Sequence, residues 1–302
     1  MTFPSAIGHG NFPQGNAFPI IFSRDLLINL RQNLVASEIT NTKYEGEISK
    51  WGDTVNILKE NVVTITPYTR GAVIPDQTLD DEQIQLLIDQ GFGYSFKIDD
   101  LEKRLSHVDW TAKQNNRAAF DLRKQIDTDI LGYMRDNGTT NSALGASGSP
   151  KLINYAGAAD FSPLNYLARL DRLLSENDVP EDGRFFAAAP AFYEQLVQEE
   201  GSLADSMVTG APSVLLNSNM MFGGRKLHTF EMYRTTNMPT SASEDAITLA
   251  GRKEATSTAT ALVDQRVEYI PGTFTKRYLG MAAYGRKVVR PEQLFTGFVK
   301  YA

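Results

Sequence analysis

One stretch decides the fold, residues 98–136, which reads IDDLEKRLSHVDWTAKQNNRAAFDLRKQIDTDILGYMRD. Its apolar residues recur in steps of three and four, the spacing of a helix with one buried face: Ile98, Leu101, Leu105, Val108, Ala112, Ala119, Leu122, Ile126, Ile130 and Tyr133. Asp99 suits the first turn, and Asn137-Gly138 suits the end. The stretch predicts one helix of about 55 Å. Such length favours an extended subunit built on a helical spine, and an ordinary long core helix is the alternative.

Upstream of the spine, residues 51–97 change to an apolar period of two, which predicts strands. The alternation runs through Val55 to Ile65, and again from Ile84 to Ile98, with a turn-rich tip at 69–82 between them. We therefore expect an antiparallel ribbon, whose first strand leads away from the rest of the subunit and whose second strand returns into the spine helix. A two-stranded ribbon is marginal alone in water, so we expect it to lean on another subunit. A hairpin packed within its own subunit is the alternative.

The first 22 residues predict an extended arm, because prolines and glycines alternate with four phenylalanines: Phe3, Phe12, Phe18 and Phe22. This segment is too aromatic for a simple disordered tail, so the phenylalanines should lie on another surface. A short helix should follow from Ser23.

Downstream of the spine, residues 136–150 are rich in Gly, Ser, Asn and Thr and predict a linker or mobile loop. Residues 160–264 have mixed character. Ser162-Pro163 predicts the start of one helix and Pro190 the start of a second. The sequence also predicts short strands at 184–189, 226–233 and 247–250. Residues 252–263 predict a weak helix, and 265–302 predict strands that pack beside the spine.

The composition narrows the class of protein. The chain has 302 residues, 42% hydrophobic and 22% charged, with net charge -6 and no cysteine. Its pI of about 5.2 argues against tight DNA binding. The absence of cysteine excludes a disulfide framework and favours an intracellular assembly site. No run approaches the roughly 20 apolar residues that cross a bilayer, and residues 1–21 do not predict a signal peptide.

Catalytic constellations are absent. The three histidines, His9, His107 and His228, lack a metalloprotease spacing, and neither a nucleophile elbow nor a Walker loop occurs. Asp127 and Asp129 should lie on different sides of the helix. We therefore predict no catalytic residue, no cofactor, no metal and no enzyme activity. A hydrolase with an acidic site, tested at Asp80 or Asp99, is a remote alternative.

The order of elements, together with local motifs, resembles the major capsid protein of tailed double-stranded DNA bacteriophages, the Hong Kong 97-type fold. The motifs are Gly52 to Ile57, Ile88 to Gln90, Phe96 to Asp100, Val179 to Arg184 with Pro190, Gly223-Gly224 with Tyr233, Asn237 and Pro239, and Tyr284 to Glu292. The similarity spans nearly the whole chain.

The resemblance implies an α+β fold with an N-terminal arm at 1–49, an extended loop at 50–97, a peripheral domain at 98–150 plus 265–302, and an axial domain at 151–264. It implies a shell subunit whose hexamers and pentamers form an icosahedral head around double-stranded DNA. The virion would be assembled in the bacterial cytoplasm. An encapsulin-like shell carrying enzyme cargo is the runner-up.

The resemblance also predicts partners and contact residues. Partners are other copies of the chain, a separate scaffolding protein, a portal and a decoration protein, with no membrane and no sequence-specific DNA binding. The predicted inter-subunit contacts lie in the arm and at the ribbon tip: Phe3, Phe12, Phe18, Phe22, Pro67, Tyr68, Arg70, Gly71, Ile74 and Pro75. The ribbon has no lysine near its tip, so a covalent cross-link there is not expected.

Overall fold

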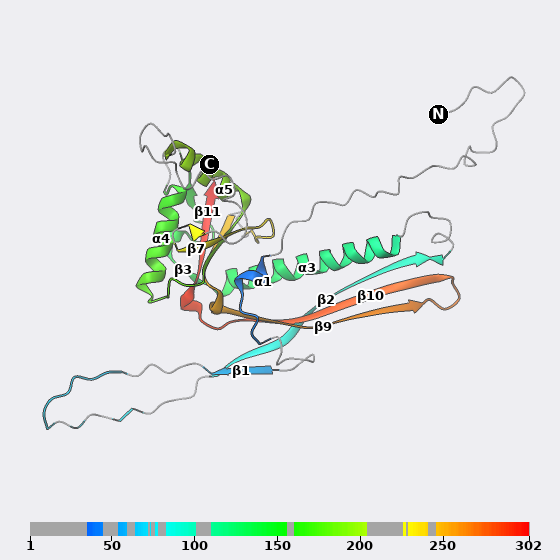
Figure 1. Cartoon of the computed structure of the whole chain (residues 1–302), viewed down its shortest axis with the longest axis horizontal. Helices are drawn as coiled ribbons and strands as arrows, with labels where there is room; N and C mark the ends of the chain where they lie inside the picture. Colours follow the sequence, from blue (N-terminus) through cyan, green and yellow to red (C-terminus); the bar gives the residue numbers. More distant parts are fainter. Residues whose placement is uncertain are drawn as a thin grey trace, which may run out of the picture.

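The computed structural model describes residues 35–44, 54–58, 64–71, 73, 76–77, 83–100, 110–155, 160–203, 226–227, 229–240 and 246–301. The predicted arm at 1–22 and the predicted helix from Ser23 lie outside these ranges. The described chain mixes helices with strands in two sheets, and Figure 1 shows one compact end from which a long, narrow layer extends.

The narrow layer is a four-stranded antiparallel sheet in the order β1-β2-β10-β9. Its strands are β1 (Thr54–Leu58), β2 (Gln83–Asp99), β10 (Thr275–Val288) and β9 (Thr256–Tyr269). The long helix α3 (Trp110–Asn137) runs along this sheet (Figure 1). The predicted ribbon is confirmed as β1 paired with β2, but most of β2 pairs with β10 of the same chain. The predicted strand around Ile65 was wrong: residues 64–66 are not in a strand, because no strand of the described chain pairs with them.

The predicted start of the spine helix lies two residues too early, because Asp100 is the first helical residue after β2. Ile98 and Asp99 are the last residues of β2 and pair with Lys276 and Thr275 of β10. The alternation that begins at Phe92 continues through Ile98, and a partner strand was available to extend it. Residues 101–109 are outside the described part, and α3 has 28 residues, about 42 Å. Its predicted end at Asn137-Gly138 is confirmed.

Other corrections concern residues 252–263 and 136–150. The predicted weak helix is mostly strand β9, because small and β-branched residues find a ladder partner in β10. The predicted loop after the spine holds β3 (Thr139–Thr140) and the short helix η2 (Ser142–Leu144). Leu144 is fully buried, so this connection is anchored to the core.

The compact end contains a seven-stranded sheet in the order β3-β11-β8-β5-β7-β6, with β4 also paired to β11. Its remaining strands are β4 (Lys151–Ile153), β5 (Arg184–Ala188), β6 (Lys226–Leu227), β7 (Phe230–Arg234), β8 (Ala246–Arg252) and β11 (Leu294–Tyr301). The helices are α1 (Ala36–Ile39), α4 (Pro163–Glu176) and α5 (Pro190–Leu203), with η3 (Lys253–Ala255) and η4 (Pro291–Gln293) as connections. Ser162 caps α4 through its side chain, with Pro163 in the first turn, as predicted.

The seven-stranded sheet has a hydrophobic cluster on each face. Strand β5 is buried throughout, and its side chains alternate between the clusters. Phe186 and Ala188 belong to the cluster under α4 and α5, whereas Phe185 and Ala187 belong to the cluster that also contains Ile130, Leu131 and Met134 of α3. The second cluster includes Tyr284 and Val288 of β10, so it joins the compact end to the four-stranded sheet.

Candidate inter-subunit surfaces

The loop between β1 and β2 carries the most exposed large apolar side chains of the described chain. Ile65 is 93% exposed and Val73 92%, and Tyr68 is also largely exposed. The Gln77 side chain crosses the loop: its Oε1 accepts the Thr64 N–H at 3.0 Å, and its Nε2 donates to the Thr64 carbonyl at 2.6 Å. This two-way contact holds the two arms of the loop together while leaving its apolar residues uncovered.

The structure places four of the predicted contact residues in this loop. Pro67, Tyr68, Arg70 and Gly71 are all exposed, and Gly71 has a φ of 86°, which suits glycine. The other six lie outside the described residues: Phe3, Phe12, Phe18, Phe22, Ile74 and Pro75. Contact with a second copy stays a prediction for all ten.

The hairpin between β9 and β10 is a second exposed apolar surface, which was not predicted from the sequence. Val267, Tyr269 and Phe274 are exposed there, Phe274 by 84%. Lys276 Nζ lies 5.0 Å from the centre of the Tyr269 ring and 3.1 Å from Asp100 Oδ1. The turn at Pro271-Gly272, between two runs of alternating apolar residues, was the signal that could have identified this tip.

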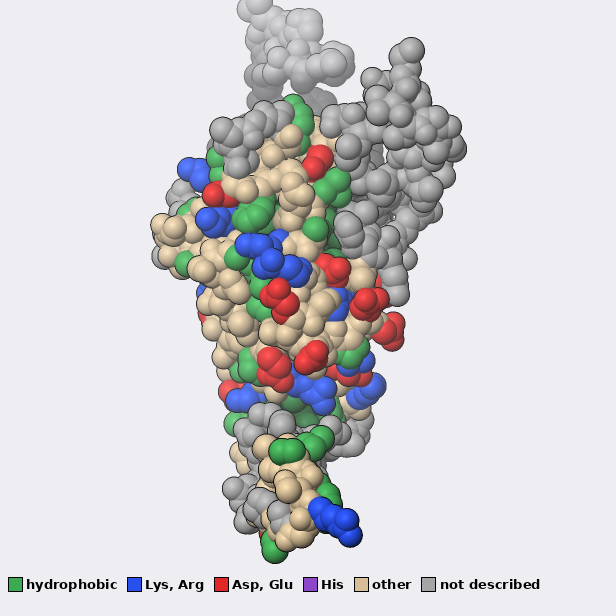
Figure 2. All heavy atoms as spheres, turned by 90° about the vertical axis from the view of Figure 1, so that its left-hand side faces the viewer, with side chains coloured by type: hydrophobic (Ala, Val, Ile, Leu, Met, Phe, Trp, Pro, Cys, Tyr) green, Lys and Arg blue, Asp and Glu red, His purple; other side chains and the backbone are tan. Residues whose placement is uncertain are grey.

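Figure 2 shows the side of the molecule on which the β1–β2 loop protrudes. Apolar side chains lie on the protruding loop, and basic and acidic side chains are interspersed on the body above it. Neighbouring opposite charges largely neutralise one another, so this face is not a single-sign patch of the kind that binds a polyanion.

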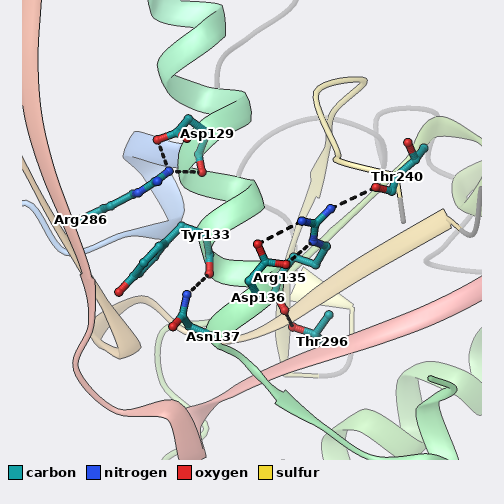
Figure 3. Close-up of polar contacts among 8 residues, drawn as sticks. All are labelled: Asp129, Tyr133, Arg135, Asp136, Asn137, Thr240, Arg286 and Thr296. Atoms are coloured by element: carbon teal, nitrogen blue, oxygen red, sulfur yellow. Dashed lines mark hydrogen bonds and ion pairs between the residues drawn. The ribbon is translucent and has the colours of Figure 1, made fainter. Parts of the chain in front are cut away.

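The C-terminal half of α3 is fastened to both sheets by polar contacts (Figure 3). Arg286 of β10 pairs with the Asp129 carboxylate, donates to the Asp129 carbonyl at 2.6 Å, and lies 4.8 Å from the centre of the Tyr133 ring. Tyr284 donates to Asp129, and burial together with this hydrogen bond raises the pKa of Tyr284, which keeps its hydroxyl protonated.

The last turn of α3 makes similar contacts with the compact end (Figure 3). Thr296 of β11 donates to the Arg135 carbonyl at 3.2 Å, and Arg135 donates to the Thr240 carbonyl at 3.0 Å. The Arg135 side chain also pairs with Asp136, and this hydrogen bond raises the pKa of Arg135. These contacts join α3 to β10, to β11 and to the segment that follows β7.

Groups of potential metal ligands and membrane-spanning helices are both absent from the described ranges. Among those residues, no group of three or more His, Cys, Asp or Glu side chains could hold a metal ion. Asp127 and Asp129 face different neighbours, as predicted, and the three histidines lie outside the described part. None of the helices in that part is both long and apolar enough to cross a membrane.

The chain is similar to solved capsid structures, although no protein-family model and no curated protein matches it. A structure from Mycobacterium phage Che8 superposes with a TM-score of 0.75 at 21% identity, covering 93% of this chain and 97% of that one. The capsid of cyanophage P-SCSP1u gives 0.70 at 15% identity, covering 99% and 97%. The capsid of a native GTA particle gives 0.64 at 12% identity, covering 95% and 96%. At these identities the likeness concerns the fold.

Proposed function

We infer that this chain, which has the fold of phage capsid proteins, is the structural subunit of an icosahedral phage head. Its hexamers and pentamers would enclose double-stranded DNA, as in tailed phages with the Hong Kong 97-type fold. The fold similarity over almost the entire length of the chain supports a shell subunit. The single observation that carries the assembly role is the β1–β2 loop, because it exposes large apolar side chains beyond the paired residues of β1 and β2.

The physical reason is that an exposed apolar side chain contributes to stability only when a contact removes its surface from water. Burying an Ile or Val side chain contributes about 1.5–3 kcal/mol, and neither Ile65 nor Val73 is covered by the described part of its own chain. A second copy offers the same cover at every position of a ring, so one favourable contact is repeated around a closed assembly.

The domain roles follow from this proposal. Within residues 50–97, the loop between β1 and β2 would lie across a neighbouring subunit, because β2 itself pairs with β10 of the same chain. Within residues 1–49, the part ahead of the buried residues 35–44 would clasp another subunit. Residues 151–264 would form the axial domain at the capsomer centre, and residues 98–150 with 265–302 the peripheral domain. β11 pairs with β8, so in this division the last strand of the peripheral domain completes a sheet of the axial domain.

The proposed partners are other copies of the chain, a separate scaffolding protein, a portal and a decoration protein. The shell would form in the host cytoplasm and become part of the virion. A net charge of -6 suits a shell that encloses DNA but binds it only weakly, because a protein that neutralises many phosphates binds DNA tightly.

The decisive experiment changes only the exposed loop. The double variant Ile65→Ser with Val73→Ser should fold and remain in solution but fail to close shells, read by sedimentation velocity and negative-stain microscopy. The matched control is Val197→Ser, since Val197 is a half-exposed valine on α5 outside the loop, and it should assemble. Normal shells from the loop variant would contradict the role given to the loop.

The nucleic-acid content of purified shells tests the second half of the proposal. Shells isolated from infected cells should contain double-stranded DNA, measured by nuclease-protected absorbance at 260 nm and gel analysis. Closed shells that hold protein cargo and no DNA would instead support the encapsulin-like alternative. A monomer that stays dispersed at high concentration would contradict both shells.

A further inference from the structure

The two sheets meet at a joint made of two chain connections. Strand β8 of the seven-stranded sheet continues through η3 into β9 of the four-stranded sheet, and β10 returns through η4 into β11. The Ala255 carbonyl at the end of η3 accepts the backbone N–H groups of Val289 and Arg290, at 2.8 and 3.1 Å. The angle between the sheets therefore depends on whatever else crosses this joint.

Residues 35–44 cross it. Val35, Ala36 and Ile39 are buried in the hydrophobic cluster that contains Phe185 and Leu249 of one sheet and Tyr284 and Val288 of the other. In Figure 1 this segment, with α1, lies between the compact end and the narrow layer. Side chains from a short segment thus pack against both bodies at the place where they join.

Asp127 of α3 holds the beginning of this segment. Its Oδ1 accepts the N–H groups of Val35 and Ala36 at 3.0 and 2.7 Å, and its Oδ2 accepts the Asn237 side-chain amide at 2.8 Å. Asp127 is only 2% exposed, so losing these hydrogen bonds would leave buried donors without an acceptor. Asn237 follows β7 of the seven-stranded sheet, so one carboxylate links that sheet, the spine helix and residues 35–36.

The other end of the segment is attached to β9. Asn41 N–H donates to the Thr256 carbonyl at 2.9 Å, and Thr258 N–H donates to the Asn41 carbonyl at 3.0 Å. The Thr40 hydroxyl lies 2.8 Å from both the Ala36 carbonyl and the Thr258 hydroxyl. Since Thr40 has one hydroxyl proton and gives it to Ala36, the Thr258 hydroxyl donates to Thr40.

We propose that residues 35–44 are a tie that sets the angle between the two sheets, with Asp127 as its positioning residue. The tie is bound on one side through Asp127 and Asn237 and on the other through Thr258. Residues 1–34 directly precede the end of the tie that Asp127 holds. A partner that binds residues 1–34 would therefore bind next to the joint. This inference goes beyond the proposed function, because it concerns a single copy of the chain.

The test measures the angle in single molecules. The chain has no cysteine, so Gln198→Cys on α5 and Glu268→Cys on β9, both exposed, provide the only two labelling positions for FRET. The parent should give a narrow transfer-efficiency peak. Asp127→Ala and the milder Thr40→Val should each broaden or displace it, because each cuts one attachment of the tie. Single-molecule dilution keeps the readout independent of assembly.

The matched control is Asp121→Ala, since Asp121 lies on the same helix but is exposed and pairs with Arg117 of that helix. It should leave the peak unchanged. Hydrogen exchange supplies a second readout: Asp127→Ala should speed exchange of the Val35 and Ala36 amides by about tenfold or more.

Two outcomes would overturn the tie. One is an unchanged FRET peak in both Asp127→Ala and Thr40→Val, whether or not their stability falls, because the segment would then contribute stability without setting the angle. The other is equal broadening in Asp121→Ala. If Asp127→Ala fails to fold, Thr40→Val decides alone, since it replaces a hydroxyl with a methyl group of similar size.

Discussion

Arg184 shows how one buried charge can organise a turn. Its side chain is 1% exposed and pairs with Asp171, and it donates to Ser175 Oγ at 3.2 Å and to the Pro180 carbonyl at 3.1 Å, with a further hydrogen bond to the Val179 carbonyl. These partners lie in α4 and in the turn before β5. The guanidinium therefore joins the end of a helix to the first residue of a central strand.

We predict that Arg184→Leu destabilises the chain by about 2–4 kcal/mol, because it leaves buried carbonyls without donors and Asp171 without its cation. Urea unfolding followed by circular dichroism measures the change. Arg172→Leu is the control, since the Arg172–Glu176 pair on α4 is half-exposed, and it should change stability by less than about 0.5 kcal/mol. Equal losses in both variants would contradict the assigned role of Arg184.

Gly297 is a position where a close approach requires glycine. A Cβ built there would lie 1.9 Å from Tyr166 Oη and 2.6 Å from Thr248 Oγ1. Tyr166 is fully buried, and its hydroxyl lies 2.7 Å from that of Thr248. A side chain on β11 at this point would therefore displace a buried hydroxyl pair.

We expect Gly297→Ala to destabilise by about 1–3 kcal/mol through overpacking, and Tyr166→Phe to recover part of that loss in the double variant by removing the Oη. A thermal double-mutant cycle measures the coupling. Gly132→Ala on α3 is the control: nothing lies within 4 Å of its Cβ, and it should stabilise by about 0.5–1 kcal/mol. Strictly additive losses would contradict the clash.

At the scale of elements, β2 shows how register changes the face of a strand. Its pairing with β10 shifts between Tyr284 and Gly285, so that Gln90 pairs with Tyr284 but Ile88 with Gly285. The even-numbered residues therefore change faces at this point: Leu86 and Ile88 pack with Ala259 and Ala283, whereas Phe92 packs toward Tyr284 and α3. An irregularity of one residue lets a single strand serve two separate clusters.

The hydrogen bond from β4 to Asp160 should contribute stability that depends on pH. Asp160 Oδ2 accepts the Leu152 N–H at 2.9 Å, and this hydrogen bond lowers the pKa of Asp160 below its ordinary value of 3.8. A lowered pKa contributes stability above the ordinary value, which is lost as the pH falls through the folded-state pKa.

We expect Asp160→Asn to lower the melting temperature at neutral pH. The difference in melting temperature between variant and parent should become smaller as the pH falls below about 3.8. Thermal unfolding between pH 7 and pH 2.5 measures this. Asp121→Asn, which removes an exposed helix pair, serves as the control. A difference that grows toward acid would contradict the assignment.

At the scale of the whole molecule, the described chain has two unequal parts. The compact end has a cluster on each face of a seven-stranded sheet, whereas the four-stranded sheet extends outward with α3 along it (Figure 1). The exposed apolar side chains of the β1–β2 loop and the β9–β10 hairpin lie on this outlying part, whose own small cluster around Leu86 and Ile88 leaves them uncovered. Their cover has to come from outside the described chain.

Stability should therefore rise with assembly. We predict that assembled particles melt at a higher temperature than dilute subunits, because binding to the folded state alone stabilises it, and each kcal/mol gained should raise the midpoint by about 2 °C. Differential scanning fluorimetry across a concentration series measures the shift. The Ile65→Ser, Val73→Ser double variant should show none. A midpoint independent of concentration in the parent would contradict the prediction.

Much of the element order could be predicted from local patterns. The cap at Ser162, the strand after Asp182-Gly183, the helix after Pro190 and the end of α3 are all confirmed, because each has a local signal in turn and capping residues. The resemblance to phage capsid proteins is confirmed at the level of the fold. Contact with other copies and the domain division remain predictions.

The errors share a cause in long-range pairing. Residues 256–263 have weak local preference and form a strand because β10 lies beside them. Ile98 belongs to β2 rather than to the helix because Lys276 of a distant strand pairs with it. Leu144 is the one large apolar residue of 136–150, and its burial depends on a cluster formed mostly by later residues.

The sequence by itself determined where helices end, which segments are strands with alternating faces, and that the chain carries an extended apolar loop, because these features arise from residues close together along the chain. Only the tertiary structure decided the start of the spine, the strand nature of β9 and the binding of residues 35–44 at the joint. Those outcomes depend on hydrogen bonds between residues up to 218 positions apart, as between Thr40 and Thr258, for which no local pattern exists.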